Sequence, residues 1–295
     1  MPALSASERD PIKLADWIEL KALYSSTRSY SLEGVRTRID ADGTLEDERD
    51  GNRDDTSESL LAFAMEEMER RESILGSAYP FKTADGTVSA TISPKYMPYI
   101  FNLLVSDREF YSPGDQETAR LFEHLVRAAV ENHLGCRALR FGARRDTMPP
   151  GIRDAITELS AQTGLRALSA YPVNNLDQDL GLDVVAWKEH SDKISNTVLF
   201  YIQCATGQSW TSKKFDCNFN EWRGIFYYFI EPIRALAIPY TLSQDDWDRE
   251  TPGVYMLDRL RIAACLRGHR LRAETINWWG WCISKIREGS RRERD

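Results

Sequence analysis

Two apolar stretches in the middle of the chain each hold one polar side chain that could do chemistry. The first, residues 181–188, carries the carboxylate of Asp183, and the second, residues 198–204, carries the amide of Gln203 near its end. The polar segment between them is of hairpin type, so the two stretches are predicted to form neighbouring strands. Carboxylate and amide oxygens are ligands that hard divalent cations take in proteins. The pattern therefore predicts a metal site where the two strands meet.

A second carboxylate lies upstream, in a segment predicted to be helical. Residues 116–134 place apolar side chains at helical spacing, and Gly135 closes the helix. Glu123 lies within this helix and could offer a further oxygen ligand. Phosphodiester hydrolysis needs an activated water and relief of the charge on phosphorus, and Mg²⁺ ions held by oxygen ligands supply both. A Mg²⁺ site built from such residues could support hydrolysis of that kind.

The order helix-Glu, strand-Asp, strand-Gln resembles that of the restriction-endonuclease-like nucleases, the PD-(D/E)XK superfamily. The strand Tyr201-Ile202-Gln203-Cys204 is similar to the one that carries the glutamine in the Mrr-like branch of that superfamily. Residues 122–135 resemble its first core helix, and residues 254–260 resemble its last strand-to-helix element. The resemblance covers residues 115–266. It implies an α/β fold in which a small mixed β-sheet is flanked by helices.

The resemblance also implies a function. The chain would be a DNA endonuclease of a restriction or anti-phage defence system, dependent on Mg²⁺ or Mn²⁺. Glu123 and Asp183 would hold the metal, with Gln203 beside it, and the fold should bring all three side chains to one cleft. A partner protein would supply recognition or control. Whether the chain also forms a homo-oligomer stays an open question.

The lysine that follows the glutamine in that branch is absent here, because Ala205 stands two residues after Gln203. In the family this lysine positions the water or stabilises charge in the transition state. Lys213 is the first choice to replace it, since the turn at Gly207 brings the chain back.

Two further lysines are alternatives, Lys214 and Lys188. Lys188 has the wrong parity, because residues 183, 185 and 187 share one face of a strand and residue 188 points away. Lys213 and Lys214 are also interpreted equally well as a solvated pair.

Phosphate contacts are expected from basic residues near the predicted strands, although surface arginines need no such role. The candidates are Arg140, Arg144, Lys214, Arg259 and Arg261.

The N-terminal part is predicted to be an α-helical module over residues 1–78. Helical spacing of apolar residues marks residues 11–24, 31–39 and 58–75. Residues 40–57 are acidic and nearly free of large apolar side chains, so a loop is expected there.

The rest of the chain is predicted to divide into a β-rich connector over residues 79–114 and a nuclease-like α/β domain over residues 115–295. Strands are expected at 138–142, 181–188, 198–204, 235–240 and 254–257. Helices are expected at 220–236 and 258–266, and residues 149–151 lead into another helix that runs to about residue 163. Residues 99–106 suit either a strand or a buried helix. Strands alternating with helices indicate an α/β core, followed by a helical, basic C-terminus.

Composition excludes several classes of function. The net charge of −7 argues against a protein that coats nucleic acid, although residues 259–295 hold ten Lys and Arg against four acids. The five cysteines and four histidines show no zinc spacing, and no phosphate-binding glycine loop is present. Without a signal pattern or a long apolar run, a cytoplasmic protein without a membrane segment is expected.

Two rival interpretations stay open. One is a catalytically inactive nuclease fold that binds DNA or a partner protein, which Ala205 and the acidic balance favour. The other is an unrelated α/β protein in which these residues coincide. Sequence specificity, the choice between DNA and RNA, and the identity of the partner cannot be predicted from these patterns.

Overall fold

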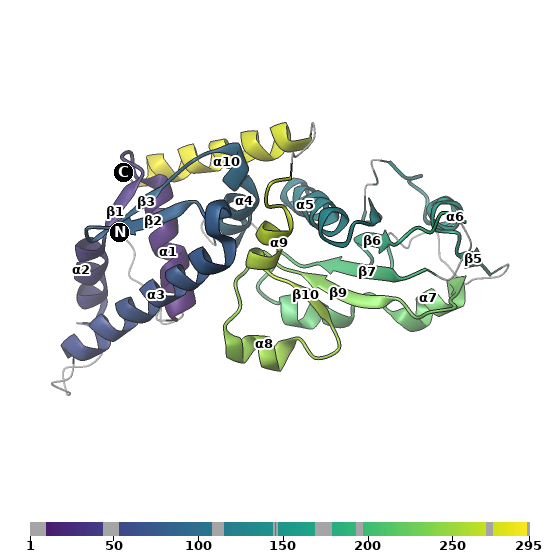
Figure 1. Ribbon diagram of the computed structural model, residues 1–295, viewed down its shortest axis with the longest axis horizontal. Coiled ribbons are helices and arrows are strands. Elements are labelled where there is room, and N and C mark those ends of the chain that lie inside the picture. Colours follow the sequence, from purple (N-terminus) through teal and green to yellow (C-terminus); the bar gives the residue numbers. More distant parts are fainter. Residues whose placement is uncertain are drawn as a thin grey trace. The chain divides into compact units, whose positions relative to one another are not determined.

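The chain forms two compact units in the computed structural model (Figure 1), Met1–Phe110 with Arg270–Asp295 and Tyr111–His269. The structure describes residues 10–43, 53–107, 115–143, 145, 147–168, 179–192, 197–269 and 274–293.

The first unit combines helices with a small antiparallel sheet of strand order β1-β3-β2. Asp10 caps the first helix by accepting a hydrogen bond from the Ile12 N–H, and Pro11 occupies the first helical position. The elements are α1 (Pro11–Tyr24), β1 (Ser29–Ser31), α2 (Leu32–Gly43), α3 (Arg53–Leu75), η2 (Gly76–Ala78), β2 (Phe81–Ala84), β3 (Thr87–Ala90), η3 (Pro94–Tyr96), α4 (Met97–Ser106) and α10 (Glu274–Arg292).

This division differs from the one predicted from the sequence. The predicted connector 79–114 contributes β2, β3 and α4 to the first unit, because β3 pairs with both β2 and β1. The C-terminal helix α10 also belongs to the first unit. It contacts α1 and α4, and it approaches α1 so closely that a Cβ on Gly289 would lie 2.4 Å from the Tyr24 ring.

The predicted acidic loop 40–57 is partly helical. Helix α2 continues through Gly43, and α3 begins at Arg53, five residues before the predicted start. Residues 44–52 lie outside the described residues. The ambiguous stretch 99–106 is helical and lies within α4, nearly all of whose residues are buried.

The second unit is mixed α/β, as predicted. Its elements follow one another in the order α5 (Gln116–Leu134), β4 (Arg137–Arg140), α6 (Ile152–Thr163), β5 (Arg166–Ala167), β6 (Val184–Trp187), β7 (Leu199–Cys204), η4 (Trp210–Phe215), α7 (Phe219–Ile225), β8 (Phe226–Tyr227), β9 (Ile233–Ala237), α8 (Gln244–Glu250), β10 (Tyr255–Leu257) and α9 (Arg259–Cys265).

A five-stranded sheet of order β10-β9-β7-β6-β4 is the centre of this unit. Strands β4, β6 and β7 pair antiparallel, whereas β7, β9 and β10 pair parallel. Parallel neighbours need crossover connections, and these connections contain α7 between β7 and β9 and α8 between β9 and β10. Helix α5 packs along β4, β6 and β7 (Figure 1). Apolar side chains that include Val185, Tyr201, Ile156 and Trp222 join the sheet to α6 and α7.

The helix predicted over 220–236 is wrong in its second half. Helix α7 ends at Ile225, and Phe226 pairs with Ala167 in the two-stranded sheet β5-β8. Pro232 follows, and a proline in that place could not donate to a helical hydrogen bond. The predicted strands at 235–240 and 254–257 correspond to β9 and β10.

No helix in the described part of the chain is long and apolar enough to span a membrane.

Candidate functional site

Asp183 lies directly before β6 and is clamped between the two neighbouring strands. Its N–H donates to the Ile202 carbonyl at 3.1 Å, and its carbonyl accepts from the N–H groups of Phe141 and Gly142. The backbone turns into this position at Gly181, which has a φ of 70°. A side chain at Gly181 would collide with the Asp216 carbonyl, so the turn requires glycine.

The carboxylates of Asp183 and Glu123 converge at Gly142. A Cβ on Gly142 would lie 2.7 Å from Glu123 Oε2 and 3.2 Å from Asp183 Oδ1, so the two oxygens are no farther apart than the sum of these distances. Small side-chain movements would therefore bring both within about 2.1 Å of one cation. Only glycine leaves room for this approach.

Arg140, the last residue of β4, is the counter-charge of this carboxylate pair. Its Nε donates to Glu123 Oε2 at 2.5 Å, and a terminal nitrogen donates to the Ala143 carbonyl. Arg140, Glu123 and Asp183 are all buried, at 5%, 9% and 8% exposure. The Arg140 guanidinium thus lies among buried acids in the described part of the chain.

The electrostatic environment disfavours the charged form of Asp183. Burial, followed by the nearby Glu123 carboxylate, raises the pKa of Asp183 well above its ordinary value. The hydrogen bond that Asp183 Oδ2 accepts from the Cys204 N–H at 2.7 Å, and the charge of Arg140, act against this rise. In the described part of the chain, Asp183 Oδ1 accepts no hydrogen bond. That oxygen has its lone pairs available to a ligand.

Gln203 lies on β7, the strand next to β6. Val184 pairs with Ile202, and one further step along this register sets Asp183 beside Gln203. The amide oxygen of Gln203 is buried, and among the described residues it has no hydrogen-bond partner. A buried acceptor without a partner needs an explanation, and a role as a ligand of an ion or a water is one. The structure brings Glu123 and Asp183 together, whereas convergence of the Gln203 side chain with them stays a prediction.

These oxygens suit a cation that takes few protein ligands. No group of three or more His, Cys, Asp and Glu side chains in the described ranges is arranged to hold a metal ion. Mg²⁺ is commonly held by only one or two carboxylates, with water completing its shell. Glu123 and Asp183 supply two carboxylates that converge in this way.

The three candidate lysines have different surroundings. Lys213, in η4, is about half exposed and pairs with Asp216 at 2.7 Å. That hydrogen bond raises the pKa of Lys213, and Asp183 and Asp179 add to the rise. Lys213 therefore lies in the field of the Asp183 carboxylate.

The other two lysines have different partners. Lys214 donates to the Glu250 carboxylate at 2.5 Å. Lys188 follows the opposite end of β6 from Asp183 and donates to the Gly135 carbonyl.

The arginines that were predicted to contact phosphate differ in how far they are buried. Arg259 is fully buried and donates to the Pro239 carbonyl at 2.9 Å. Burial leaves neither Arg259 nor Arg140 a surface from which to contact a phosphate backbone, so packing and charge pairing account for them. Arg261 is exposed and lies 4.1 Å from the Trp247 ring centre. Arg144 lies outside the described residues.

Asp179 and Gly142 belong to the site but were missed from the sequence. Asp179 accepts a hydrogen bond from the Gly181 N–H at 2.9 Å, which shapes the turn into Asp183. The signal for Asp179 was its position two residues before a glycine, a pattern typical of side-chain-stabilised turns. The signal for Gly142 was a glycine at the end of a predicted strand, which often marks a close approach.

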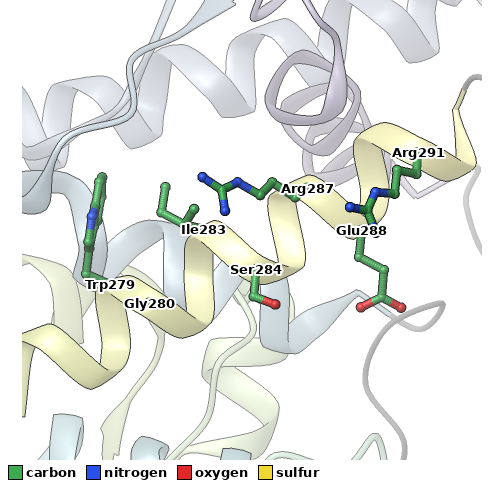
Figure 2. Close-up of a pocket in the computed structure, with 7 residues that line it drawn as sticks. All are labelled: Trp279, Gly280, Ile283, Ser284, Arg287, Glu288 and Arg291. Atoms are coloured by element: carbon green, nitrogen blue, oxygen red, sulfur yellow. The ribbon is translucent and has the colours of Figure 1, made fainter.

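A hollow of about 550 Å³ lies along α10 in the first unit, away from these residues in the chain. Figure 2 shows Trp279, Ile283 and Arg287 on one side of the helix, with Ser284 and Glu288 pointing the other way. All of its lining residues come from α10, and none of them is a predicted site residue.

No protein-family model matches the chain, and neither the curated proteins nor the solved structures include a match to it.

Proposed function

We propose that the second unit is a metal-dependent DNA endonuclease of the restriction-endonuclease-like, PD-(D/E)XK kind. The observation that carries this proposal is the meeting of two buried carboxylates, Glu123 from α5 and Asp183 from the start of β6, at Gly142. Buried like charges are costly unless something neutralises them. A site built this way is suited to a divalent cation.

The order of elements supports the same proposal. A helix with an acid, α5, precedes three antiparallel strands, and a helix then leads to a parallel fourth strand. This is a small mixed sheet flanked by helices, the arrangement that the resemblance implies. Asp183, directly before β6, lies beside Gln203 of the adjacent strand β7 in the register of this pair, which agrees with the order of site residues in that family.

Each residue has a role in the proposed hydrolysis. Glu123 and Asp183 would hold Mg²⁺ or Mn²⁺, which lowers the pKa of a bound water and offsets charge on the phosphate. Arg140 orients Glu123, and the Cys204 N–H fixes Asp183 through Oδ2, which leaves Oδ1 available. Lys213 would approach the scissile phosphate on its flexible stem. The cellular role that we propose is restriction or anti-phage defence in the cytoplasm, with a partner protein that supplies recognition.

The direct test is divalent-dependent nicking of supercoiled plasmid by purified wild-type protein and by Asp183→Asn. The variant should lose cleavage while it keeps its fold by circular dichroism. The matched control is Glu189→Gln, an exposed acid just past the other end of β6, which should cleave at the wild-type rate. A wild-type cleavage rate in Asp183→Asn would reject the role of this carboxylate.

Two observations favour the second candidate, an inactive nuclease fold that binds DNA or a partner protein. Arg140 already offers Glu123 a buried positive charge at 2.5 Å, and Ala205 replaces the usual lysine. Calorimetric titration with Mn²⁺ separates the candidates. Saturable binding that Asp183→Asn abolishes supports the enzyme, whereas DNA binding without either metal binding or cleavage supports the inactive subunit.

A further inference from the structure

The hollow along α10 of the first unit contains two arginines whose charges no described residue neutralises. Arg287 and Arg291 line the hollow and are exposed, and neither forms an ion pair or a hydrogen bond with a described side chain. They lie four residues apart, a spacing that sets side chains beside each other on one face of a helix. The hollow therefore presents two neighbouring cations to a ligand.

The acid beside these arginines has cations of its own. Among the described residues that line the hollow, Glu288 is the one acid. It pairs with Lys285 at 3.3 Å and with Arg292 at 2.8 Å. Figure 2 shows Glu288 pointing away from the side of the helix that carries Arg287. An anion in the hollow would therefore meet an excess of positive charge.

Trp279 gives the hollow a ring that the fold does not use. Its neighbour Trp278 is buried, and Trp281 contacts Phe101, with ring centroids 4.9 Å apart. Trp279 is half-buried, and in the described part of the chain it makes no ring contact and no hydrogen bond. Figure 2 shows it on the same side of α10 as Arg287. This ring is available to stack on a flat ligand such as a nucleobase.

Gly280 lies inside α10 without a packing reason. A glycine in the interior of a helix lowers its stability relative to alanine. At Gly289 the fold requires glycine, since a Cβ there would lie 2.4 Å from the Tyr24 ring. A Cβ on Gly280 would instead meet no described atom within 4 Å. Gly280 lines the hollow, so its glycine leaves the backbone of α10 open to close approach by a ligand.

We propose that the hollow binds a single nucleic-acid strand, with a base on Trp279 and phosphates on Arg287 and Arg291. Arginine pairs with phosphate through two parallel N–H groups. The twelve residues from Trp279 to Arg291 extend about 18 Å along the helix axis. A strand advances about 3.4 Å per nucleotide, so this length corresponds to roughly five nucleotides. A mononucleotide is too short to contact the ring and both arginines.

A membrane surface fits this face of α10 less well. A helix that lies in a membrane interface buries a face of large apolar side chains. The exposed residues that line the hollow are instead Gly280, Ser284, Arg287 and Arg291. The proposal concerns the first unit, so it does not depend on the nuclease proposed for the second.

The test is the fluorescence anisotropy of a labelled oligodeoxythymidine of about 12 nucleotides, within the usual site sizes of single-strand-binding proteins. The full chain is titrated in EDTA, which excludes cleavage and any metal at Asp183. The double variant Arg287→Gln, Arg291→Gln should bind more weakly. Its slope of log K against log salt should be smaller by about 1.4, because each phosphate contact on a single strand contributes about 0.7.

The matched control is the double variant Lys82→Gln, Lys95→Gln. It removes two exposed cations from the same unit, and neither lysine lines the hollow. The net charge changes equally in the two double variants, so a difference between them reports contacts in the hollow. The control should keep the affinity and the salt slope of the wild type.

Two further variants test the ring and the open backbone. Trp279→Ala should weaken binding by about 5- to 150-fold, the range for loss of one stacked base, whereas Trp279→Phe keeps a ring and should lose less. Gly280→Leu places a side chain in the hollow. Leucine favours a helix more than glycine does, so circular dichroism should show an intact fold while binding weakens.

Several results would overturn the proposal. One is a wild type that does not bind the oligonucleotide, or that binds only vesicles of phosphatidylserine. Another is an arginine double variant that binds like the lysine control. A Trp279→Ala or Gly280→Leu variant with the affinity of the wild type would overturn it as well.

Discussion

Each unit buries an arginine beside carboxylates, Arg71 in the first and Arg140 in the second. Arg71 is fully buried, and its guanidinium pairs with three acids, Asp16, Glu19 and Glu67, at 2.7 to 3.0 Å. Burial alone would lower the pKa of Arg71, but Tyr99 and the three acids raise it above its ordinary value. The arginine of the first unit is held in its charged form.

The acids of this first cluster are equally well partnered. Glu19 is fully buried, and it accepts hydrogen bonds from the hydroxyls of Tyr79 and Tyr99 as well as from Arg71. A buried polar network that is fully hydrogen-bonded makes a structure rigid. The Arg71 cluster joins α1, α3 and α4, so its role is to hold the first unit together.

The second cluster is only partly satisfied. Asp183 Oδ1 and Gln203 Oε1 accept no hydrogen bond from the described residues. Burial and the Glu123 carboxylate raise the pKa of Asp183. A buried polar group without a hydrogen-bond partner lowers stability. Proteins retain such groups where a bound ligand interacts with them. The difference between the clusters distinguishes a structural network from a candidate site.

Removal of Arg71 should disrupt the first cluster, and we expect this substitution to lower the free energy of unfolding more than any other considered. Arg71→Met leaves Glu19 buried without its cation, and loss of one partner from a buried pair costs about 3–5 kcal/mol. Hydrogen exchange should show faster exchange in α1 and α3 by the corresponding factor, while β6 and β7 exchange as in the wild type.

Arg70→Met is the control for this prediction. Arg70 binds the same Glu67 at 2.7 Å, but its side chain is 43% exposed. Exposed pairs contribute about 0–1 kcal/mol, so α1 and α3 should change little. Equal effects of the two substitutions would contradict the structural role of the Arg71 cluster.

The sequence predicts the helix and strands that carry the site better than it predicts the ion-pair partners of the site's side chains. The helix of Glu123 and the strands of Asp183 and Gln203 follow from local patterns of apolar residues, which α5, β6 and β7 bear out. Local periodicity contains no information on charge pairing. Arg140 was therefore predicted to contact phosphate, although its partner is Glu123, 17 residues away on the neighbouring helix.

The errors in the fold have the same origin. The aromatic residues after Ile225 suit a helix by spacing, but Phe226 pairs with Ala167, which only the folded chain brings near. Helix α10 follows the second unit in sequence but packs on α1, where Gly289 meets Tyr24. Contacts between such distant residues depend on tertiary packing, and no short window of sequence reveals them.

Lys213→Ala tests whether a lysine beside the second cluster takes part in cleavage. Lys213 lies in the field of Asp183, and loss of one transition-state contact typically lowers turnover by about 10²–10³-fold. DNA affinity should change little, because the lysine acts on the scissile phosphate alone. Single-turnover cleavage and a binding isotherm measure the two effects separately.

Lys188→Ala is the comparison for Lys213→Ala, since Lys188 binds the Gly135 carbonyl at the far end of β6. Its cleavage rate should stay near that of the wild type. If Lys213→Ala cleaves as fast as Lys188→Ala, Lys213 has no part in the reaction, and the site works without it or uses another cation.

The smallest expected effect is a gain in stability from Asp183→Asn in metal-free buffer, opposite in sign to the loss from Arg71→Met. Between the ordinary aspartate pKa of about 4 and the raised pKa of Asp183, the unfolded chain has lost a proton that the folded chain keeps. Stability of the wild type therefore falls as pH rises through this window.

Asparagine does not titrate, and its amide oxygen can still accept from the Cys204 N–H. The variant should gain about 0.5–2 kcal/mol at neutral pH, the usual size for relief of a strained functional site, and the gain should vanish as pH approaches 4. Hydrogen exchange of β6 and β7 amides, corrected for intrinsic rates at each pH, measures this difference. A variant less stable than the wild type at neutral pH would mean that the Asp183 carboxylate stabilises the fold, as the Arg71 cluster does.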